Sequence, residues 1–167
     1  MVGTACLQKS KHAKCEAGPP DYLYTMFHAI VLGLAMQSAS ISVAAERRML
    51  ADLNATRARA GLSMLKLDNR LTQVARLHGI DMAEHNYFSH ASQSGQSPFD
   101  RMKSFRISFS WAGENLAMSP DEPTAYQALL QSPEHLANIM QRHFSKVGIA
   151  AVQGPDGEML FVQDFTN

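Results

Sequence analysis

Two histidines and one glutamate are the side chains in this sequence best suited to chemistry. His90 follows an expected helix end, and His135 lies in the first turn of a further expected helix. Between them, Glu114 follows Gly113 in a strand-like run, where glycine often marks a bulge or a close approach of backbone. Two imidazoles and a carboxylate suit Zn²⁺ or another divalent cation. The three residues are therefore candidate metal ligands, and Glu114 is also a candidate catalytic residue.

Three interpretations of these residues are open. Both histidines could hold a divalent metal while Glu114 completes the ligand set or orients a metal-bound water. Without a metal, Glu114 and a histidine could form an acid-base pair that activates water or a substrate hydroxyl. The residues could also form a structural network that fixes loops. A serine hydrolase built on Ser89 or Ser132 is disfavoured, because Ser132 is better explained as a helix cap.

The other histidines after residue 45 have simpler explanations. His78 lies on the apolar stripe of an expected helix, where a histidine is more often a buried, hydrogen-bonded packing residue than a ligand. His85 and His143 are expected at helix ends among polar neighbours, and no function is assigned to them.

Three further residues near the candidate site are given structural roles. Asp100 and Arg101 are expected to form a local ion pair at the start of a short helix that Ser97-Pro98 begins. Trp111 is expected in the core, and the alternative is that it lines the site. None of the three is predicted to take part in catalysis.

The hydrophobic periodicity predicts helices followed by a hairpin. The helices are expected at residues 46–60, 68–85, 98–105, 123–131 and 134–141. Residues 105–111 alternate and predict a strand, and residues 147–151 and 159–165 predict a hairpin around a Gly-Pro-Asp-Gly turn. Helices early in the chain and strands concentrated in its last third predict an α+β fold with helices packed on an antiparallel sheet.

Composition limits the class of function. The chain has 167 residues, of which 46% are hydrophobic, and its formal net charge is zero. This length is typical of one domain. A neutral chain lacks the basic surface expected of a nucleic-acid binder or of a protein that docks on membranes by charge, so both classes are excluded.

The first 45 residues predict an export segment. Three lysines precede the apolar run 22–36, and small residues follow it, which is the order of a secretory signal. The expected cut is ahead of Glu46, leaving a domain at residues 46–167. The run is shorter than the roughly 20 residues of a membrane span, so an uncleaved anchor, the one membrane link considered, is less favoured. We expect an extracytoplasmic protein, secreted or periplasmic. Cys6 and Cys15 precede the cut, so the expected domain contains no cysteine and must be stabilised by its core without disulfides.

Seven motifs, in order, cover most of the chain after residue 50. They are LNATRARAGLSMLKLDNRL (53–71), HGIDMAEHNYFSH (78–90), SPFDRM (97–102), GENLA (113–117), SPEHLANIM (132–140), VGIA (147–150) and FVQDF (161–165). In this order and spacing they resemble the CAP superfamily, also called SCP domains. That family includes cysteine-rich secretory proteins, insect venom antigens and plant pathogenesis-related proteins. The pattern is most similar to the short, disulfide-free bacterial branch.

The resemblance implies a fold and a site. It implies an α-β-α sandwich, in which helices flank a central antiparallel sheet, and a cleft lined by two histidines and two glutamates. By motif position these include His90, His135 and Glu114. In many eukaryotic members the second glutamate comes from the helix before the last histidine, but residues 123–131 contain no carboxylate. Glu134 occupies a different motif position, so the role is not assigned to it.

Two classes of function follow from the resemblance. Family members have been linked to lipid binding, defence, signalling and adhesion, which favours a binding module for a lipid, a cell-wall fragment or a protein. The alternative is a metal-dependent or acid-base hydrolase that acts on peptide or cell-wall material. A fold indicates a site more strongly than a reaction, so the binding module is the first expectation.

Overall fold

A five-stranded sheet forms the centre of the part of the chain that the computed structural model describes, residues 38–155 and 157–167. Its strands are β1 (Ser40–Ile41), β2 (Lys66–Leu67), β3 (Ala112–Ser119), β4 (Lys146–Gln153) and β5 (Met159–Thr166). They are ordered β1-β4-β5-β3, and β2 pairs with β4 in parallel beside β1. The predicted hairpin is confirmed, because β4 and β5 pair antiparallel over their whole length.

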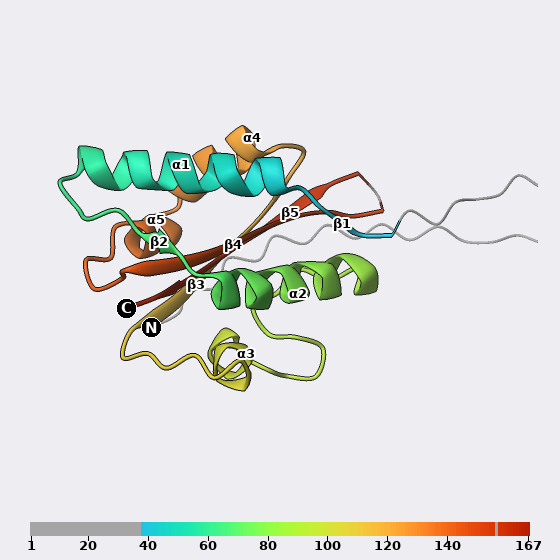
Figure 1. The fold of residues 1–167 in the computed structure, drawn as a ribbon. Helices are drawn as coiled ribbons and strands as arrows, with labels where there is room; N and C mark the ends of the chain where they lie inside the picture. The colour runs from blue at the N-terminus through green and yellow to red at the C-terminus, as the bar shows by residue number, and fades with distance from the viewer. Residues whose placement is uncertain (1–37, 156) are drawn as a thin grey trace, which may run out of the picture. The chain divides into compact units, whose positions relative to one another are not determined.

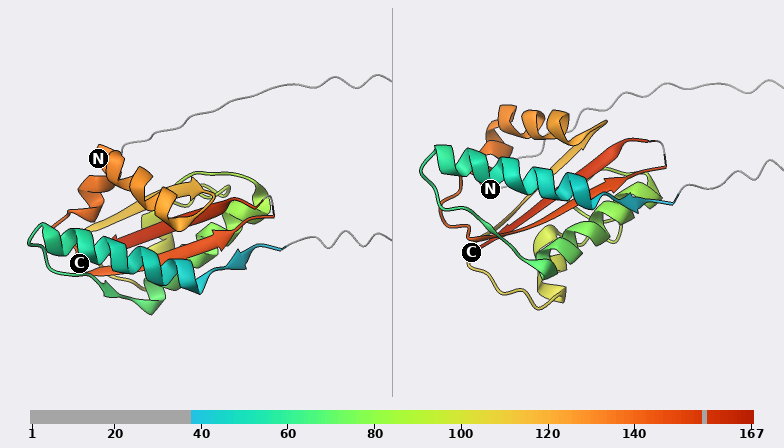
Figure 2. Two further views of the ribbon diagram at one scale, coloured as in Figure 1. Left: turned by 90° about the horizontal axis from the view of Figure 1, so that it is seen from above. Right: turned by 45° about the horizontal axis from the view of Figure 1, so that its top comes forward.

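Helices cover both faces of the sheet (Figure 1). They are α1 (Val43–Arg59), α2 (Asn69–His85), α3 (Pro98–Ser104), α4 (Glu122–Gln131) and α5 (Pro133–Ile139). Helices α1, α4 and α5 lie on one face and α2 and α3 on the other, and Figure 2 shows α1 running along the strands. The predicted α-β-α sandwich is confirmed. Within the described residues, no helix is long and apolar enough to cross a membrane.

Alternate residues of the strands serve two separate cores. Val147, Ile149 and Phe161 belong to the larger core, with side chains from α1, α4 and α5. Ala150 and Val162 belong to a core with α2. Neighbouring residues of one strand therefore face different helices, which decides where each polar residue of β3 and β5 lies.

Close packing fixes α2 on the sheet. Asp68 caps this helix by accepting the backbone N–H groups of Arg70 and Leu71. A Cβ placed on Gly148 of β4 would lie 2.1 Å from the carbonyl carbon of Leu71. Only glycine allows this approach, so α2 contacts the strand backbone directly and its inward side chains reach the sheet.

The strand predicted at residues 105–111 is wrong. Helix α3 ends at Ser104, Arg106 adopts a φ of 56°, and the strand begins only at Ala112. The alternating residues Phe105 and Phe109 instead pack from a loop against the α2–α3 core. Trp111 is 48% exposed rather than in the core, and its ring stacks on His143 with centroids 4.4 Å apart.

The described chain is folded on both sides of the predicted cut. Residues 1–37, most of the predicted export segment, lie outside the described residues. Strand β1 pairs with β4, and α1 begins at Val43, so the boundary ahead of Glu46 falls inside a helix. Ala45 is fully buried in the larger core.

Candidate functional site

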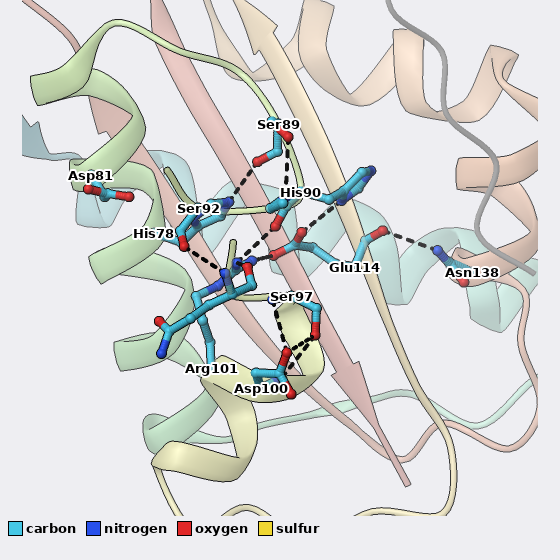
Figure 3. A network of polar contacts seen from close by, with 12 residues as sticks. His78, Asp81, Ser89, His90, Ser92, Ser97, Asp100, Arg101, Glu114 and Asn138 are labelled. Carbon is cyan, nitrogen blue, oxygen red and sulfur yellow. Dashed lines mark hydrogen bonds and ion pairs between the residues drawn. The ribbon is translucent and has the colours of Figure 1, made fainter. Parts of the chain in front are cut away.

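Glu114 and His90 form the centre of the site. Glu114 projects from β3 toward the α2 face, with its side chain only 1% exposed. His90 comes from the loop after α2, and its Nδ1 lies 2.7 Å from Glu114 Oε1 (Figure 3). A carboxylate accepts at this distance, so Nδ1 carries the ring proton and donates it. The structure thus brings these two predicted residues together.

Arg101 holds the other side of the Glu114 carboxylate. Its Nη2 donates to Glu114 Oε2 at 2.6 Å, and its Nη1 donates to the carbonyl of His90 (Figure 3). The same Nη1 also donates to the carbonyl of Gln96. One guanidinium therefore balances the buried charge and fixes the His90 loop.

The predicted Asp100–Arg101 ion pair is wrong. Asp100 instead forms a capping box with Ser97 at the start of α3, as expected of a helix-start residue. Pro98, Arg101 and Met102, at i, i+3 and i+4, are the buried residues of α3. That spacing was the sequence signal that Arg101 faces inward.

Asp164 is a site neighbour that sequence reasoning missed. It lies directly opposite Glu114 in the β3–β5 register and is wholly buried. Burial raises the pKa of Asp164 well above its usual value, and the charge of Glu114 adds to the rise, while Arg101 opposes it. The raised pKa favours the protonated form of Asp164 beside the Glu114 side chain.

His78 supports the site from α2. As predicted, it is a buried packing residue, and its Nε2 lies 2.9 Å from the carbonyl of Ser89, the residue before His90. Burial is the main cause that lowers the pKa of His78. The neutral ring donates its Nε2 proton to this carbonyl, which fixes the backbone immediately before His90.

His135 lies on α5, where amide side chains hold its backbone. Asn115 Nδ2 donates to the His135 carbonyl at 3.1 Å and to Gln163 Oε1. Asn138 of α5 donates to Asn115 Oδ1 at 2.9 Å and to the Glu114 carbonyl. A Cβ on Gly113 would lie 2.9 Å from Asn138 Oδ1, which confirms the expected close approach at this glycine.

His135 interacts electrostatically with His90. Burial lowers the pKa of His135, and the charge of His90 lowers it further. Among the described residues, the His135 side chain makes no hydrogen bond to His90 or Glu114. The structure therefore pairs His90 with Glu114 and places His135 within electrostatic range of His90.

The fit to a divalent cation is partial. Both Glu114 oxygens are engaged, and within residues 38–155 and 157–167 no group of three or more His, Cys, Asp or Glu side chains is placed to hold a metal. The imidazoles of His90 and His135 remain as candidate ligands. Glu114 has the position of an outer partner that orients a ligating histidine.

Among the described residues, neither candidate serine has its hydroxyl hydrogen-bonded to a histidine. The Ser89 hydroxyl accepts the backbone N–H of Ala91. Ser132 occupies the predicted N-cap position of α5, but its side chain makes no capping hydrogen bond.

The missing fourth carboxylate is not supplied by α4. This helix begins one residue earlier than predicted, at Glu122, which is buried. Its nearest cation is Arg48 of α1, with Nε and Oε2 3.9 Å apart, so Glu122 belongs to the α1–α4 contact.

A cavity of about 270 Å³ with both apolar and polar lining residues lies beside the network. His78 and Arg101 line it together with Asp81, Ser92 and Gln96. Hydroxyl, amide and carboxylate groups thus face this cavity next to the His90 loop.

Comparison with known proteins gives the chain's relatives. Residues 50–165 match the sequence profile of the cysteine-rich secretory protein (CAP) family. The chain is 40% identical over 118 residues to YkwD, an uncharacterized protein of Bacillus subtilis, covering 70% of this chain and 46% of that protein. It therefore spans less than half of that relative.

Two solved structures are similar. An extracellular SCP-domain protein from Bacillus anthracis is 30% identical with a TM-score of 0.67, over 74% of this chain and 40% of that one. An outer surface protein from Borrelia burgdorferi is 22% identical with a TM-score of 0.72, over 77% and 98%, and shares the fold.

Proposed function

Because this chain belongs to the cysteine-rich secretory protein (CAP) family, we propose that it is an extracytoplasmic binding module whose site is built on His90, Glu114 and His135. The predicted export segment supports a location outside the cytoplasm. The extracellular protein and the outer surface protein to which the chain is similar support it as well. The ligand we propose is a hydroxyl-rich cell-wall fragment.

The observation that carries this proposal is the chain of hydrogen bonds from Arg101 through Glu114 to His90. Glu114 accepts from Nδ1, so the Nε2 of His90 bears a lone pair at a side chain that is 25% exposed. A hydroxyl group of the ligand can donate to this fixed acceptor. Because the site is preorganised, binding costs less conformational entropy.

The nearby cavity offers polar groups to a hydroxyl-rich ligand. Ser92, Gln96 and Asp81 offer both donors and acceptors there. Val74, Leu77 and Phe105 also line this cavity, so a lipid is the first alternative ligand and a protein is the second.

Hydrolysis is the second candidate function, because the hydrogen bond between His90 and Glu114 favours it. A histidine whose tautomer is set by a carboxylate can accept a proton from water, which is general-base catalysis. The other route to hydrolysis has no histidine base: His90 and His135 would hold a divalent cation, with Glu114 as outer partner, and the cation would supply Lewis-acid activation.

The first experiment is calorimetric titration of the full-length chain with soluble muropeptides. We expect saturable binding that the His90→Ala/His135→Ala double variant loses, with its fold verified by circular dichroism. The control is the His143→Ala variant, because His143 stacks on Trp111 and contacts no residue of the site or cavity. Equal binding by all three proteins, or none by the native chain, would contradict the proposal.

Zinc titration of the same proteins tests the second candidate. Saturable Zn²⁺ binding that only the His90→Ala/His135→Ala variant loses would support a cation there and justify a hydrolase screen with muropeptides. If the His90→Ala/His135→Ala variant and the His143→Ala control both bind Zn²⁺ as the native chain does, the cation does not lie at His90 and His135.

A further inference from the structure

The cavity of about 270 Å³ beside the His90 loop carries an unbalanced negative charge. Asp81 and Arg101 are the charged residues of its lining. Arg101 is matched, because its guanidinium donates to the Glu114 carboxylate at 2.6 Å. Within the described residues, no lysine or arginine forms an ion pair with Asp81. Asp81 therefore presents a carboxylate that a ligand cation can balance.

Two side chains hold the Asp81 carboxylate in place. The Tyr87 hydroxyl donates to its Oδ2, and the His85 Nδ1 lies 3.0 Å from its Oδ1. Burial and the hydrogen bond to Asp81 raise the pKa of Tyr87, so the phenol is a neutral partner. The Asp81 side chain is still 36% exposed, and each carboxylate oxygen can accept a further hydrogen bond. A ligand donor can therefore reach a fixed acceptor.

The apolar part of the lining leads toward this carboxylate. Val74, Leu77 and Asp81 lie three and four residues apart, on one face of α2. Leu77 is 49% exposed, and Phe105, the residue after α3, adds an aromatic ring. The helix rises about 10 Å from Val74 to Asp81. The cavity is thus apolar along this face and acidic at the end where Figure 3 shows Asp81 on α2.

A primary ammonium at the end of an alkyl stem fits both parts of this lining. Its methylene groups can pack against Leu77 and Phe105, which removes apolar surface from water. Its ammonium can donate to Asp81 in a charge-assisted hydrogen bond. A stem of four carbons with its nitrogen spans roughly 6 Å, which is shorter than the stretch from Val74 to Asp81. A neutral alkyl chain would instead place hydrocarbon against a carboxylate, which is unfavourable.

We propose that this cavity binds the side chain of a lysine-like residue in the peptide part of the cell-wall fragment. The side-chain ammonium donates to Asp81, and the methylene groups pack against Leu77 and Phe105. The ammonium site rests on the proposed function and deepens it, because it names the ligand group that the cavity selects. Asp81 is then a specificity-determining residue, beside the three residues on which the site is built.

The first test is NMR titration of the full-length ¹⁵N-labelled chain with Nα-acetyl-lysine N-methylamide at pH 8, where an exposed histidine carries no charge. We expect a saturable shift of the Leu77 and Asp81 amides. The matched probe carries a second acetyl group on the side-chain nitrogen, which removes its charge, and should bind at least about threefold more weakly. Equal affinity of the two probes, or no shift of these amides at the solubility limit, would overturn the proposal.

Two variants locate the ammonium, each with its fold verified by circular dichroism. Asp81→Asn should weaken the charged probe at least about threefold and leave the acetylated probe unchanged. Leu77→Ala shortens the apolar wall and should weaken both probes. Glu84→Gln, an exposed acid on the same helix outside the cavity lining, is the matched control and should change neither. If Asp81→Asn binds the charged probe as tightly as the native chain does, the ammonium does not lie at Asp81 and the proposal fails.

Muropeptides that contain lysine separate this proposal from the proposed function. If the native chain binds them equally well with a free and with an acetylated side-chain amine, the proposed function stands and the ammonium site is refuted. If the chain binds the lysine probe at Asp81 but binds no muropeptide, the ammonium site stands and the proposed function is contradicted.

Discussion

Two pairs of adjacent residues on β3 and β5 show how differently the two faces of the sheet are built. Glu114 and Asp164 face α2 and α3, where an arginine is matched to a buried carboxylate. Asn115 and Gln163, one residue along each strand, face the other layer, where amides bond to one another and to α5. At these two pairs of residues, the α2 side of the sheet is ionic and the α5 side is neutral, and they are called the ionic face and the amide face below.

The difference shows how each histidine is positioned. On the ionic face, Arg101 and Glu114 fix the side chain and loop of His90. On the amide face, Asn115 fixes the backbone of His135 and leaves its imidazole to respond to charge. Neutral networks tolerate the loss of a member better, because no buried charge is left unpaired.

Replacing Arg101 should have the largest effect on stability. Arg101→Leu leaves the Glu114 carboxylate buried without its cation, which costs about 3–5 kcal/mol. The free energy of unfolding, measured in urea, should fall by that amount. Lys103→Leu, an exposed change on the same helix, should stay within about 0.5 kcal/mol.

A double variant shows whether the charge is the cause. Arg101→Leu/Glu114→Gln removes both charges and should recover part of the stability that Arg101→Leu loses. If the double variant is less stable than Arg101→Leu, the loss comes from packing and the ionic description of this face is wrong.

Breaking the amide face should cost less. Asn115→Ala removes the hydrogen bonds to His135, Gln163 and Asn138 but exposes no charge, so we expect a loss of about 1–3 kcal/mol in the same urea measurement. The exposed Asn69→Ala is the control. A loss as large as that of Arg101→Leu would remove the contrast between the two faces.

The sequence predicted most of the fold, because helix and hairpin periodicities are local signals. Strands β1 and β2 were missed, since two residues have no measurable period. The predicted strand at 105–111 was wrong because a loop that packs alternate aromatic residues produces the same pattern as a strand. Periodicity reports which side chains are buried, not the hydrogen bonds of the backbone.

The sequence predicted only those site residues that occupy a recognisable motif position. His90 and Glu114 were paired through the family resemblance. Arg101 was missed because its partner lies in another element, and its role depends on α3 packing against β3. Asp164 was missed because only the strand register places it opposite Glu114.

Asp164 gives the ionic face a pH dependence. Since folding raises its pKa, its stabilising contribution is complete below the ordinary value of 3.8 and is lost as the pH rises toward the raised value. Asp164→Asn has no such dependence. The stability of this variant relative to the native chain should therefore increase between pH 4 and pH 7, as measured by urea unfolding at each pH. A constant difference would mean that Asp164 is not held neutral.

The smallest effect expected is on the titration of His135, where the two faces meet. The charge of Glu134 raises the pKa of His135 and that of His90 lowers it, while burial lowers it most. Glu134→Gln should therefore lower the pKa slightly, and His90→Asn should raise it, as followed by the His135 ring signals in NMR. Glu134 is exposed, so its replacement should leave stability within about 0.5 kcal/mol. If His90→Asn leaves the His135 titration unchanged, the two histidines do not share one site, because charges that close must affect each other.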